Sequence, residues 1–427
     1  MGKNTDVNLR HLMIYQVYVR NHTEEGTFRA LMDDLDRIKE LGSDIVYLLP
    51  IHPIGVENRK GKLGSPYAIQ DYYGINKELG NLDDFKALIS AVHAKDMKIM
   101  MDIVFNHTSP DSVLRNTHPE YFYRNSEGNF ANRVGDWWDI IDFDYQRDEG
   151  LSKYLIDNLL YWTKMGIDGF RFDVSSFLPL EFLKKAHKAV KTINPDTIWL
   201  SESVHEQFLH LIRNSGFECL SECELYQVFD LAYDYDIHPE FEAFLKSEGT
   251  LEEYAKAVMR QEVIYPKNYI KMRNLENHDF GRIAGFVNED EDLVDNWHAF
   301  SFFNKGATMI FSGGEFSASK HPDLFNKDTI SREGRNISEL IKRLQVITTH
   351  PIFADGIFDL KAIQGALVGR YTKEDKTMVG IFNVSKGRGV IPFEGVDKTV
   401  RNLINGEIIE IKDGKLYLTF KPMIFEL

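Results

Sequence analysis

Short runs of hydrophobic and β-branched residues alternate with longer amphipathic segments up to about residue 350. The runs have the length of buried strands, and the segments between them carry apolar side chains at helical spacing. Strands are predicted at eight places: Met13 to Val19, Asp44 to Leu49, Lys98 to Phe105, Gly169 to Asp173, Thr197 to Ser201, Cys219 to Glu222, Tyr269 to Leu275 and Thr308 to Phe311. Eight strands alternating with helices predict an α/β fold, the (β/α)₈ TIM barrel, whose active site lies at the carboxyl ends of the strands.

Two of the intervening segments show the helical pattern most clearly. From Asn81 to Lys95, the first residue can cap a helix and the apolar side chains form one stripe. The segment from Leu151 to Met165 has the same kind of stripe, and Gly166 follows as a helix-ending residue. Both segments are predicted to be helices that cover the barrel.

The hydrophobic pattern changes at two places. Between His107 and Gln146, a long stretch rich in Asn, Asp, His, Trp and Tyr separates the third strand from its helix, which indicates a small excursion domain over the site. From Pro351 onward, closely spaced β-runs and tight turns predict an all-β C-terminal domain. We therefore assign residues 1–106 and 147–350 to the barrel, 107–146 to the excursion domain and 351–427 to a C-terminal β-sandwich.

Composition narrows the classes of partner. With 65 Asp and Glu against 50 Lys and Arg, the formal net charge is -15, which argues against a nucleic-acid or anionic-membrane partner and suits a neutral ligand. The start of the chain lacks an apolar run of signal-peptide length, so we expect a cytoplasmic protein, although a removed leader would also fit. Cys219 and Cys223 are too few for a disulfide framework and lack zinc-ligand spacing. Nothing in the sequence predicts the oligomeric state.

Candidate chemistry begins on the fourth predicted strand. Arg171 and Asp173 are two residues apart there and so point to the same face. Two charged groups on an apolar strand are costly to bury unless they pair or do chemistry. An arginine partner holds an aspartate ionised, as a carboxylate nucleophile requires, but a structural ion pair would explain this stretch equally well.

The ends of other predicted strands carry more chemistry-bearing residues. The third strand ends in the run 102–107, the fifth in Ser201-Glu202-Ser203 and the seventh in the run 276–279. In a barrel, these ends lie on one rim. Carboxylates, histidines and an arginine are therefore predicted to converge, which a purely structural role does not explain.

In these runs the sequence resembles the α-amylase family of glycoside hydrolases over nearly its whole length. The resemblance rests on four motifs in order: DIVFNH (102–107), GFRFD (169–173), SES around Glu202 and NHD (277–279). Weaker matches are YLLPIHPI (47–54), SPYAIQDY (65–72), IDFD (141–144) and FSGGE (311–315). Any one motif could be accidental, but four in order are specific.

The resemblance implies a role for three carboxylates, with Asp173 as nucleophile, Glu202 as general acid/base and Asp279 as the carboxylate that stabilises the transition state. This division of roles suits one ionised and one protonated carboxyl group. A separation of about 5 to 5.5 Å between the first two would give retention through a covalent glycosyl-enzyme. No cofactor is required for that chemistry.

The resemblance also implies substrate contacts. His107 and His278 would hydrogen-bond sugar hydroxyls, Tyr67 would stack beneath the sugar ring, and Asp102 would orient Arg171. For each histidine alone, a structural imidazole is the alternative, and Tyr67 could equally be a core residue.

Two further aromatic residues, Trp137 and Trp138, could be sugar-stacking platforms. The alternative, which we favour, is that at least one of them packs the excursion domain onto the barrel.

The sequence departs from the family pattern in two respects. Ser175-Ser176 stands where many starch-cleaving endo-enzymes of the family have Lys-His, which argues against a typical starch-degrading endo-amylase and leaves room for action on short maltodextrins or for glucosyl transfer. The acidic calcium loop that some relatives have near the first strand is missing, although Asn106 and Asp142 match positions that bind calcium in amylases and their oxygens would suit that ion. A structural calcium at these two residues is therefore an open alternative.

The sequence thus predicts a retaining hydrolase of carbohydrate metabolism that cleaves α-1,4-glucosidic bonds in maltooligosaccharides or α-glucans. An α-glucosidase, a glucanotransferase or a trehalose- or sucrose-type isomerase of the same family is the alternative. A silent barrel that only binds glycan is a remote alternative, because all three carboxylates are present.

Overall fold

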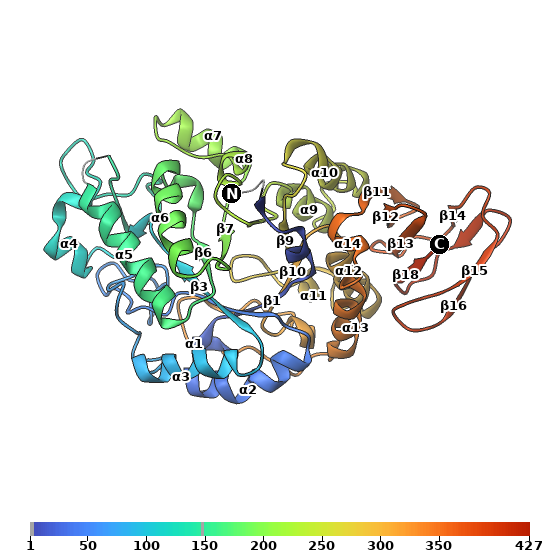
Figure 1. Ribbon diagram of the computed structural model, residues 1–427, viewed down its shortest axis with the longest axis horizontal. Helices are drawn as coiled ribbons and strands as arrows, with labels where there is room; N and C mark the ends of the chain where they lie inside the picture. The colour runs from blue at the N-terminus through green and yellow to red at the C-terminus, as the bar shows by residue number, and fades with distance from the viewer. Residues whose placement is uncertain (1–3, 147–148) are drawn as a thin grey trace.

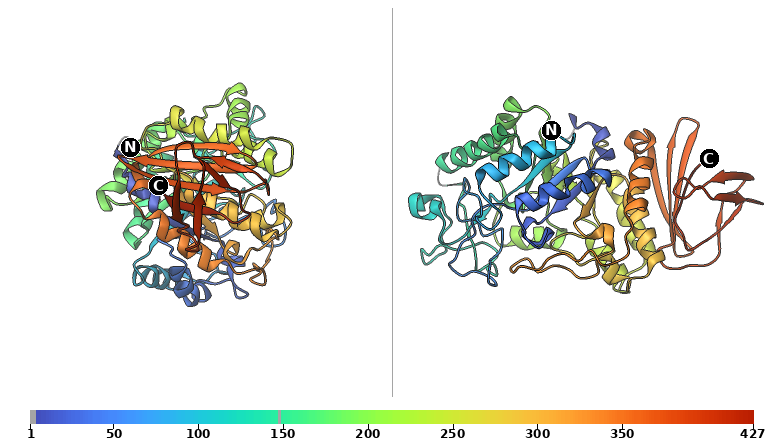
Figure 2. Two further views of the ribbon diagram at one scale, coloured as in Figure 1. Left: turned by 90° about the vertical axis from the view of Figure 1, so that its right-hand side faces the viewer. Right: turned by 90° about the horizontal axis from the view of Figure 1, so that it is seen from below.

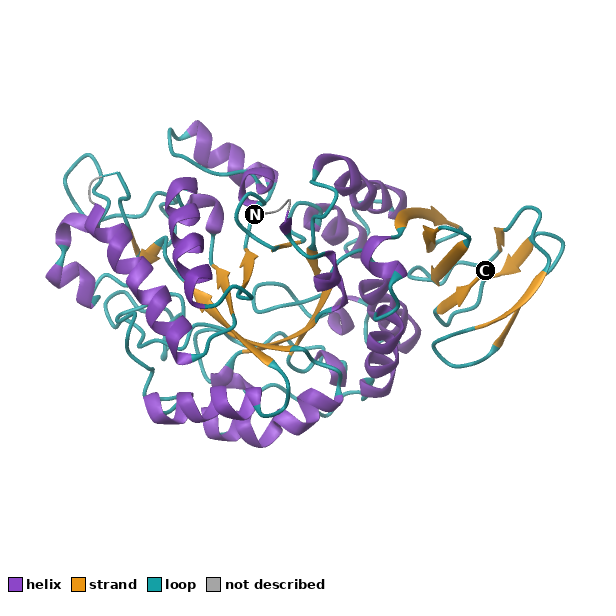
Figure 3. Cartoon of the chain, viewed as in Figure 1, coloured by secondary structure: helices purple, strands orange, loops and turns teal. Residues whose placement is uncertain are grey.

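The computed structural model describes residues 4–146 and 149–427, and its central feature is a closed barrel of eight parallel strands (Figure 3). The barrel confirms the predicted fold class. The order of its strands around the barrel is β1 (Met13–Val17), β10 (Ala307–Phe311), β9 (Lys271–Arg273), β8 (Leu231–Tyr233), β7 (Ile198–Ser201), β6 (Gly169–Phe172), β3 (Lys98–Ile103) and β2 (Ile45–Leu48).

The alternation of side chains along each strand separates two cores. In β6, Phe170 and Phe172 pack among the helices, while Arg171 between them points into the barrel, where it faces the rings of Tyr67 and Tyr233. Apolar side chains such as Met100 and Leu200 fill the rest of the interior. The barrel is therefore a packed core whose polar groups gather at one end.

Helices surround the barrel, as Figures 1 and 3 show. The longer ones are α2 (Phe28–Glu40), α3 (Leu82–His93), α5 (Glu149–Met165), α6 (Leu180–Ile193), α10 (Leu251–Ile264), α12 (Glu291–Phe303) and α13 (Ser338–Thr348). The shorter ones are α1 (Val19–His22), α4 (Val113–Thr117), α7 (Glu206–Asn214), α8 (Glu222–Leu225), α9 (His238–Leu245), α11 (Ile283–Phe286) and α14 (Ile352–Asp355). Both helices predicted from their apolar stripes are present, and Asn81 and Asp84 form a capping box on α3.

The prediction of the sixth barrel strand was wrong. Residues 219–222 do not form a strand, because Ser221 and Glu224 make a capping box that starts helix α8. The sixth barrel strand is instead β8, which is only three residues long and pairs with β7 and β9. Because β8 is so short, its apolar residues do not stand out in the sequence from the polar residues on either side.

The long stretch after β3 contains a small antiparallel pair, β4 (His107–Thr108) and β5 (Ile141–Asp142). Helix α4 lies between these strands in the sequence, at the far left of Figure 1. Phe122, Phe130 and Phe143 pack together to give the stretch an apolar centre. We call residues 107–146 the excursion from here on.

The C-terminal residues form β-sheets at the opposite end of the molecule (Figures 1 and 2). A four-stranded antiparallel sheet consists of β11 (Ile357–Ile363), β12 (Ala366–Lys373), β13 (Lys376–Phe382) and β18 (Met423–Glu426). Two hairpin-like pairs cover one face of it: β14 (Val390–Pro392) with β17 (Lys415–Tyr417), and β15 (Lys398–Arg401) with β16 (Ile408–Ile411). Among the described residues, no helix has the length and hydrophobicity to cross a membrane.

Candidate active site

One buried guanidinium, that of Arg171, organises the carboxyl end of the barrel. Its Nη1 atom lies 2.8 Å from Asp102 Oδ1 and 3.1 Å from Asp173 Oδ1, and its Nη2 atom lies 2.7 Å from Glu202 Oε1. The side chain of Arg171 is fully buried, and those of Asp173 and Glu202 are each only 10% exposed. Residues from β3, β6 and β7 thus meet on one cation, as the positions of the strand ends predicted.

Burial sets the protonation of this cluster. Burial raises the pKa of Glu202 to about 7, with Arg171 lowering it and the charge of Asp279 raising it further. Burial and the charge of Glu202 also raise the pKa of Asp173, and they outweigh the opposing effect of Arg171. Arg171 therefore does not hold Asp173 ionised by itself, because it is shared among three carboxylates. Near neutral pH the pair Asp173 and Glu202 retains a proton that is available for acid catalysis.

The backbone after β6 takes an unusual conformation to hold Glu202. Val174 has φ +36° and ψ +46°, the left-handed region that a β-branched residue rarely adopts. In this conformation its N–H donates a 2.6 Å hydrogen bond to Glu202 Oε2. The sequence held no signal for this contact, because valine does not predict a left-handed backbone.

Ser175 and Ser176 hydrogen-bond to residues at and just after the end of β7. They are the residues that depart from the family pattern. Ser175 Oγ lies 2.7 Å from Ser201 Oγ and donates to the carbonyl oxygen of Glu202 at 2.9 Å. Ser176 Oγ accepts a hydrogen bond from the N–H of Val204. Both serines are buried and so position the loop that carries Glu202.

A chain of polar contacts links Asp102 to the third carboxylate. Asp102 Oδ2 accepts from the hydroxyls of Tyr47 and Tyr67 at 2.8 and 2.9 Å. The Tyr67 hydroxyl also lies 2.6 Å from His278 Nε2, and that nitrogen lies 3.2 Å from Asp279 Oδ2. The rings of Tyr67 and His278 are nearly parallel, with centroids 5.3 Å apart. Asp279, at 42% side-chain exposure, faces the opening.

His107 also lies near the nucleophile candidate, with Nε2 3.9 Å from Asp173 Oδ2. Burial and the nearby charge of Lys60 lower the pKa of His107 to about 3, and burial lowers that of His278, so both imidazoles are neutral. A neutral imidazole can donate from one nitrogen and accept at the other, which suits sugar hydroxyls.

The two tryptophans of the excursion have different environments. Trp137 packs against His107, with ring centroids 5.9 Å apart, and against Phe177 and Phe208. Trp138 is 62% exposed. One tryptophan therefore packs the excursion onto the barrel, and the other has a free face.

The candidate calcium residues lie at the base of the excursion. Asn106 Nδ2 donates to Asp142 Oδ1 at 3.3 Å, and Asn106 Oδ1 is buried without a hydrogen-bond partner among the described residues. Asp142 Oδ2 accepts from the backbone N–H of Arg133 at 2.9 Å and lies 3.3 Å from Arg133 Nη1. Calcium takes about six to eight oxygen ligands, whereas Asp142 is already paired with a guanidinium. Calcium at these two residues stays a prediction, with the partnerless Asn106 Oδ1 for it and the Arg133 guanidinium on Asp142 against it.

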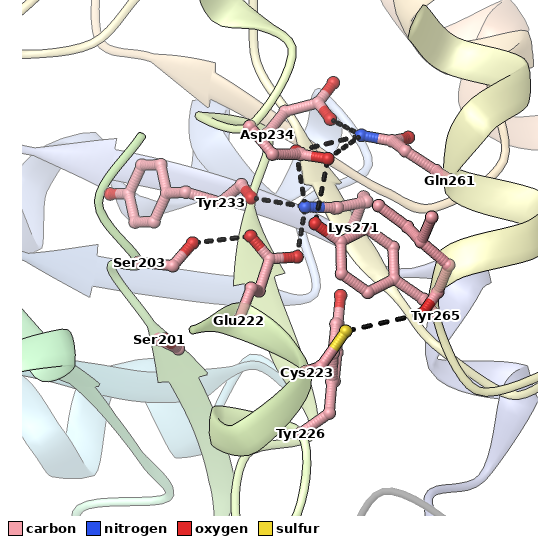
Figure 4. Close-up of polar contacts among 12 residues, drawn as sticks. Ser201, Ser203, Glu222, Cys223, Tyr226, Tyr233, Asp234, Gln261, Tyr265 and Lys271 are labelled. Atoms are coloured by element: carbon pink, nitrogen blue, oxygen red, sulfur yellow. Dashed lines mark hydrogen bonds and ion pairs between the residues drawn. The ribbon is translucent and has the colours of Figure 1, made fainter. Parts of the chain in front are cut away.

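A second buried ionic cluster contacts the segment after β7 at Ser203 (Figure 4). Lys271 is fully buried and contacts Glu222 and, at 2.6 Å, Asp236 Oδ1. Ser203, the residue after Glu202, donates a 2.6 Å hydrogen bond to Glu222 Oε2. Sequence reasoning missed this cluster, because it placed residues 219–222 in a barrel strand.

The predicted site residues border one cavity of about 280 Å³. Asp173, Glu202 and Asp279 line it together with the three predicted substrate-binding residues Tyr67, His107 and His278. Arg171 and Asp102 lie beneath these residues and are fully buried. Lys60 and Asp139, which the sequence did not single out, also line the cavity. A barrel with three carboxylates and neutral polar groups around a cavity at its carboxyl rim has the form of a carbohydrate-active enzyme.

Comparison with known proteins agrees with that class. Residues 14–351 match the model of the alpha amylase catalytic domain, and residues 359–425 match that of the bacterial alpha amylase C-terminal domain. The chain belongs to the alpha-amylase family, as the motifs predicted.

Two solved structures are similar over almost the whole chain. An alpha-amylase from Lactobacillus plantarum is 40% identical with a TM-score of 0.95, and the match covers 99% of this chain and 100% of that one. The maltogenic alpha-amylase AmyB from Thermotoga neapolitana is 32% identical with a TM-score of 0.87, over 98% and 99% of the two chains.

Curated relatives match a smaller part. The alpha-1,4-glucan:maltose-1-phosphate maltosyltransferase of Picrophilus torridus is 31% identical over 238 residues, which cover 49% of this chain and 38% of that enzyme. The similarity to these transferases is thus confined to a portion of each protein.

Proposed function

We propose that this protein is a retaining glycoside hydrolase that cleaves α-1,4-glucosidic bonds in maltooligosaccharides or short α-glucans. The observation that carries the proposal is the single guanidinium of Arg171 shared by Asp173 and Glu202. Asp173 contacts one terminal nitrogen of this group and Glu202 contacts the other, so the two carboxylates are close neighbours in the same cavity. The similarity to an alpha-amylase over the whole chain supports the choice of substrate.

The mechanism uses the proton that the pair Asp173 and Glu202 retains, placed on Glu202, with Asp173 ionised. A carboxylate oxygen of Asp173 attacks the anomeric carbon while the bond to the leaving oxygen breaks, and the proton of Glu202 passes to that oxygen. The ionised Glu202 then removes a proton from water, whose oxygen attacks the anomeric carbon and releases Asp173. A sugar hydroxyl in place of water gives transfer, which is the reaction named for the curated relatives.

The surrounding groups bind and orient the sugar. The neutral imidazoles of His107 and His278 offer hydrogen bonds to hydroxyls on either side of Asp173, and Asp279 accepts one from the exposed side. Asp102 acts through Arg171, whose position it fixes at 2.8 Å. Tyr67 provides a ring at the floor of the cavity, and its hydroxyl is held by Asp102 and His278.

The test is the time-resolved product profile of the purified protein with maltoheptaose, next to Asp173→Asn. We expect short maltooligosaccharides from wild type, and a loss of turnover of about 10³-fold or more in the variant, with an unchanged circular dichroism spectrum. Asp196→Asn, the same substitution at an exposed position outside the cavity, is the matched control. Products longer than the substrate would identify transfer as the main reaction, and unchanged turnover in Asp173→Asn would refute the mechanism.

A further inference from the structure

The loop between β2 and α3 reaches across the cavity to the excursion. At its tip, Lys60 Nζ lies 2.7 Å from Asp139 Oδ1. The side chain of Asp139 is 4% exposed and that of Lys60 is 21% exposed, so the ion pair is largely removed from water. Breaking a pair in such an environment is costly, because it leaves a buried charge without a partner.

The loop after β10 joins the same contact. The backbone N–H of Leu63 donates to the carbonyl oxygen of Phe325 at 3.0 Å, and that of Lys62 donates to Asn326 Oδ1 at 3.0 Å. Gly61, the residue before Lys62, has φ +61°, and a Cβ atom there would lie 2.7 Å from Phe325 Cβ. The backbone of the first loop therefore contacts both the backbone and a side chain of the second.

Aromatic rings complete this contact. Lys60 Nζ lies 4.7 Å from the centroid of the Trp138 ring and 5.9 Å from that of Phe325. Cation–π attraction adds to the ion pair at such distances. We call Lys60, Asp139, Trp138 and Phe325 the three-loop wall, because they come from the loops after β2, β3 and β10.

The strand order places the three-loop wall relative to the chemistry. In the barrel, β2 and β10 flank β1, and β7 is the strand directly opposite β1. Glu202 follows β7 and is the group that must face the leaving oxygen. The wall thus lies across the cavity from the leaving group, on the side where the non-reducing part of the substrate is held.

The size of the cavity is consistent with a closed end. Lys60, Asp139 and Phe325 line the same 280 Å³ as Asp173 and Glu202. That volume is just below the range for ligand sites, roughly 300–1,000 Å³, and suits a short oligosaccharide better than a long chain running through.

We propose that the Lys60–Asp139 ion pair closes the glycone end of the cleft, so that the enzyme works from the non-reducing ends of α-glucan chains. This inference rests on the proposed function and adds the end of the α-glucan chain at which the enzyme cleaves. A chain enters with its non-reducing end against the three-loop wall, and internal segments are excluded because they would have to pass through it.

The test compares maltoheptaose with maltoheptaose whose non-reducing glucose carries a 4,6-ethylidene group, with products followed by mass spectrometry. We expect wild type to cleave the blocked substrate at least about 100-fold more slowly than the free one. Equal rates on both would overturn this inference while leaving the proposed hydrolysis intact. Cleavage of neither would overturn the proposed function, and this inference with it.

Variants of Lys60 and Asp139 test whether their ion pair causes the slow cleavage of the blocked substrate. Lys60→Ala removes the bridge, and we expect its ratio of blocked to free rates to rise about 10-fold or more above that of wild type. Asp139→Asn keeps the shape but removes the charge, and should raise the ratio in the same direction. The matched control is Lys62→Ala, since Lys62 is an exposed lysine of the same loop with no ion-pair partner among the described residues. An unchanged ratio in a folded Lys60→Ala protein would contradict the role of the ion pair.

Discussion

At the scale of single residues, charge balance is the dominant feature of the site. Arg171 brings one positive charge to three carboxylates, two of which border the cavity. Such a set holds a proton at pH values where an exposed carboxyl group would have lost it. Neutral sugars fit this arrangement better than anionic ones. Asp173, Glu202 and Asp279 line the opening, and the charge of Lys60, which also lines it, is already paired with Asp139.

The pKa of Glu202 predicts the pH dependence of the reaction. In the proposed mechanism the protonated form of Glu202 is the acid catalyst. Because its pKa is raised to about 7, kcat/KM for maltoheptaose should fall as pH rises through about 7, by up to tenfold per pH unit. The apparent value belongs to the pair Glu202 and Asp173 rather than to one group.

The control for that profile is Glu202→Gln with an aryl glycoside whose leaving group needs no protonation. We expect residual activity without the fall above pH 7. A profile in wild type that stays flat to pH 9 would show that Glu202 is not the titrating acid.

Several contacts at this scale could be predicted from the sequence, and others could not. The spacing of Arg171 and Asp173 already placed them on one face, and the strand-end motifs brought Glu202 and His278 to the same rim. The left-handed Val174 and the bridge from Lys60 could not be predicted, because each depends on tertiary contacts that no local pattern encodes.

At the scale of elements, buried ion clusters fasten the loops that carry the chemistry. Lys271 in β9 and Ser201 in β7 both pair with Ala232 in β8, so the two residues lie at the same height in the barrel. From there its ammonium reaches Glu222 at the start of α8, which in turn holds Ser203 beside Glu202. The cluster therefore ties three elements to the loop that carries Glu202.

Lys271→Met should destabilise the protein strongly. The substitution leaves Glu222 and Asp236 buried without their cation, and the free energy of unfolding should fall by roughly 3–5 kcal/mol in urea denaturation. Lys267→Met, at an exposed neighbouring position, should change it by less than about 0.5 kcal/mol. A loss below about 1 kcal/mol for Lys271→Met would show that water or rearrangement satisfies the two carboxylates.

The excursion provides a prediction about metal removal. Because Arg133 already pairs with Asp142, we expect dialysis against EDTA, and then addition of calcium, to leave the melting temperature and activity unchanged. A calcium ion bound only by the folded state would stabilise it by about 2.7 kcal/mol at 100 times its Kd, which would be readily seen as a shift in Tm. Calcium-dependent recovery of Tm after EDTA would contradict this expectation.

Element types were easier to predict than the exact strands. The apolar stripe and the N-cap of α3 were sufficient to predict that helix. In contrast, β8 is a three-residue strand that depends on pairing with its two neighbouring strands. The S-x-x-E pattern at Ser221 could have identified α8, since it is a local signature of a helix start.

At the scale of the whole molecule, the C-terminal sheet is tied to the barrel through α12. Asn296 in this helix donates to the carbonyl oxygen of Phe420 and accepts from the N–H of Asn383, both at 2.7 Å. Phe303 at the end of the helix lies against Gly369 and Gly380, where any side chain would clash with its ring. The sequence predicted an all-β C-terminal part but not this docking, which needs two glycines that face a phenylalanine.

The central claim is that Asp173 forms a covalent bond to the sugar during a retaining reaction. The most direct test is to incubate the protein with 5-fluoro-α-glucosyl fluoride, which slows release of the glycosyl group, and to digest and sequence the labelled peptide by mass spectrometry. The account predicts one fluoroglucosyl group on Asp173, and no label in Asp173→Asn. A label on another carboxylate, or turnover with inversion of the anomeric configuration and no label, would contradict it.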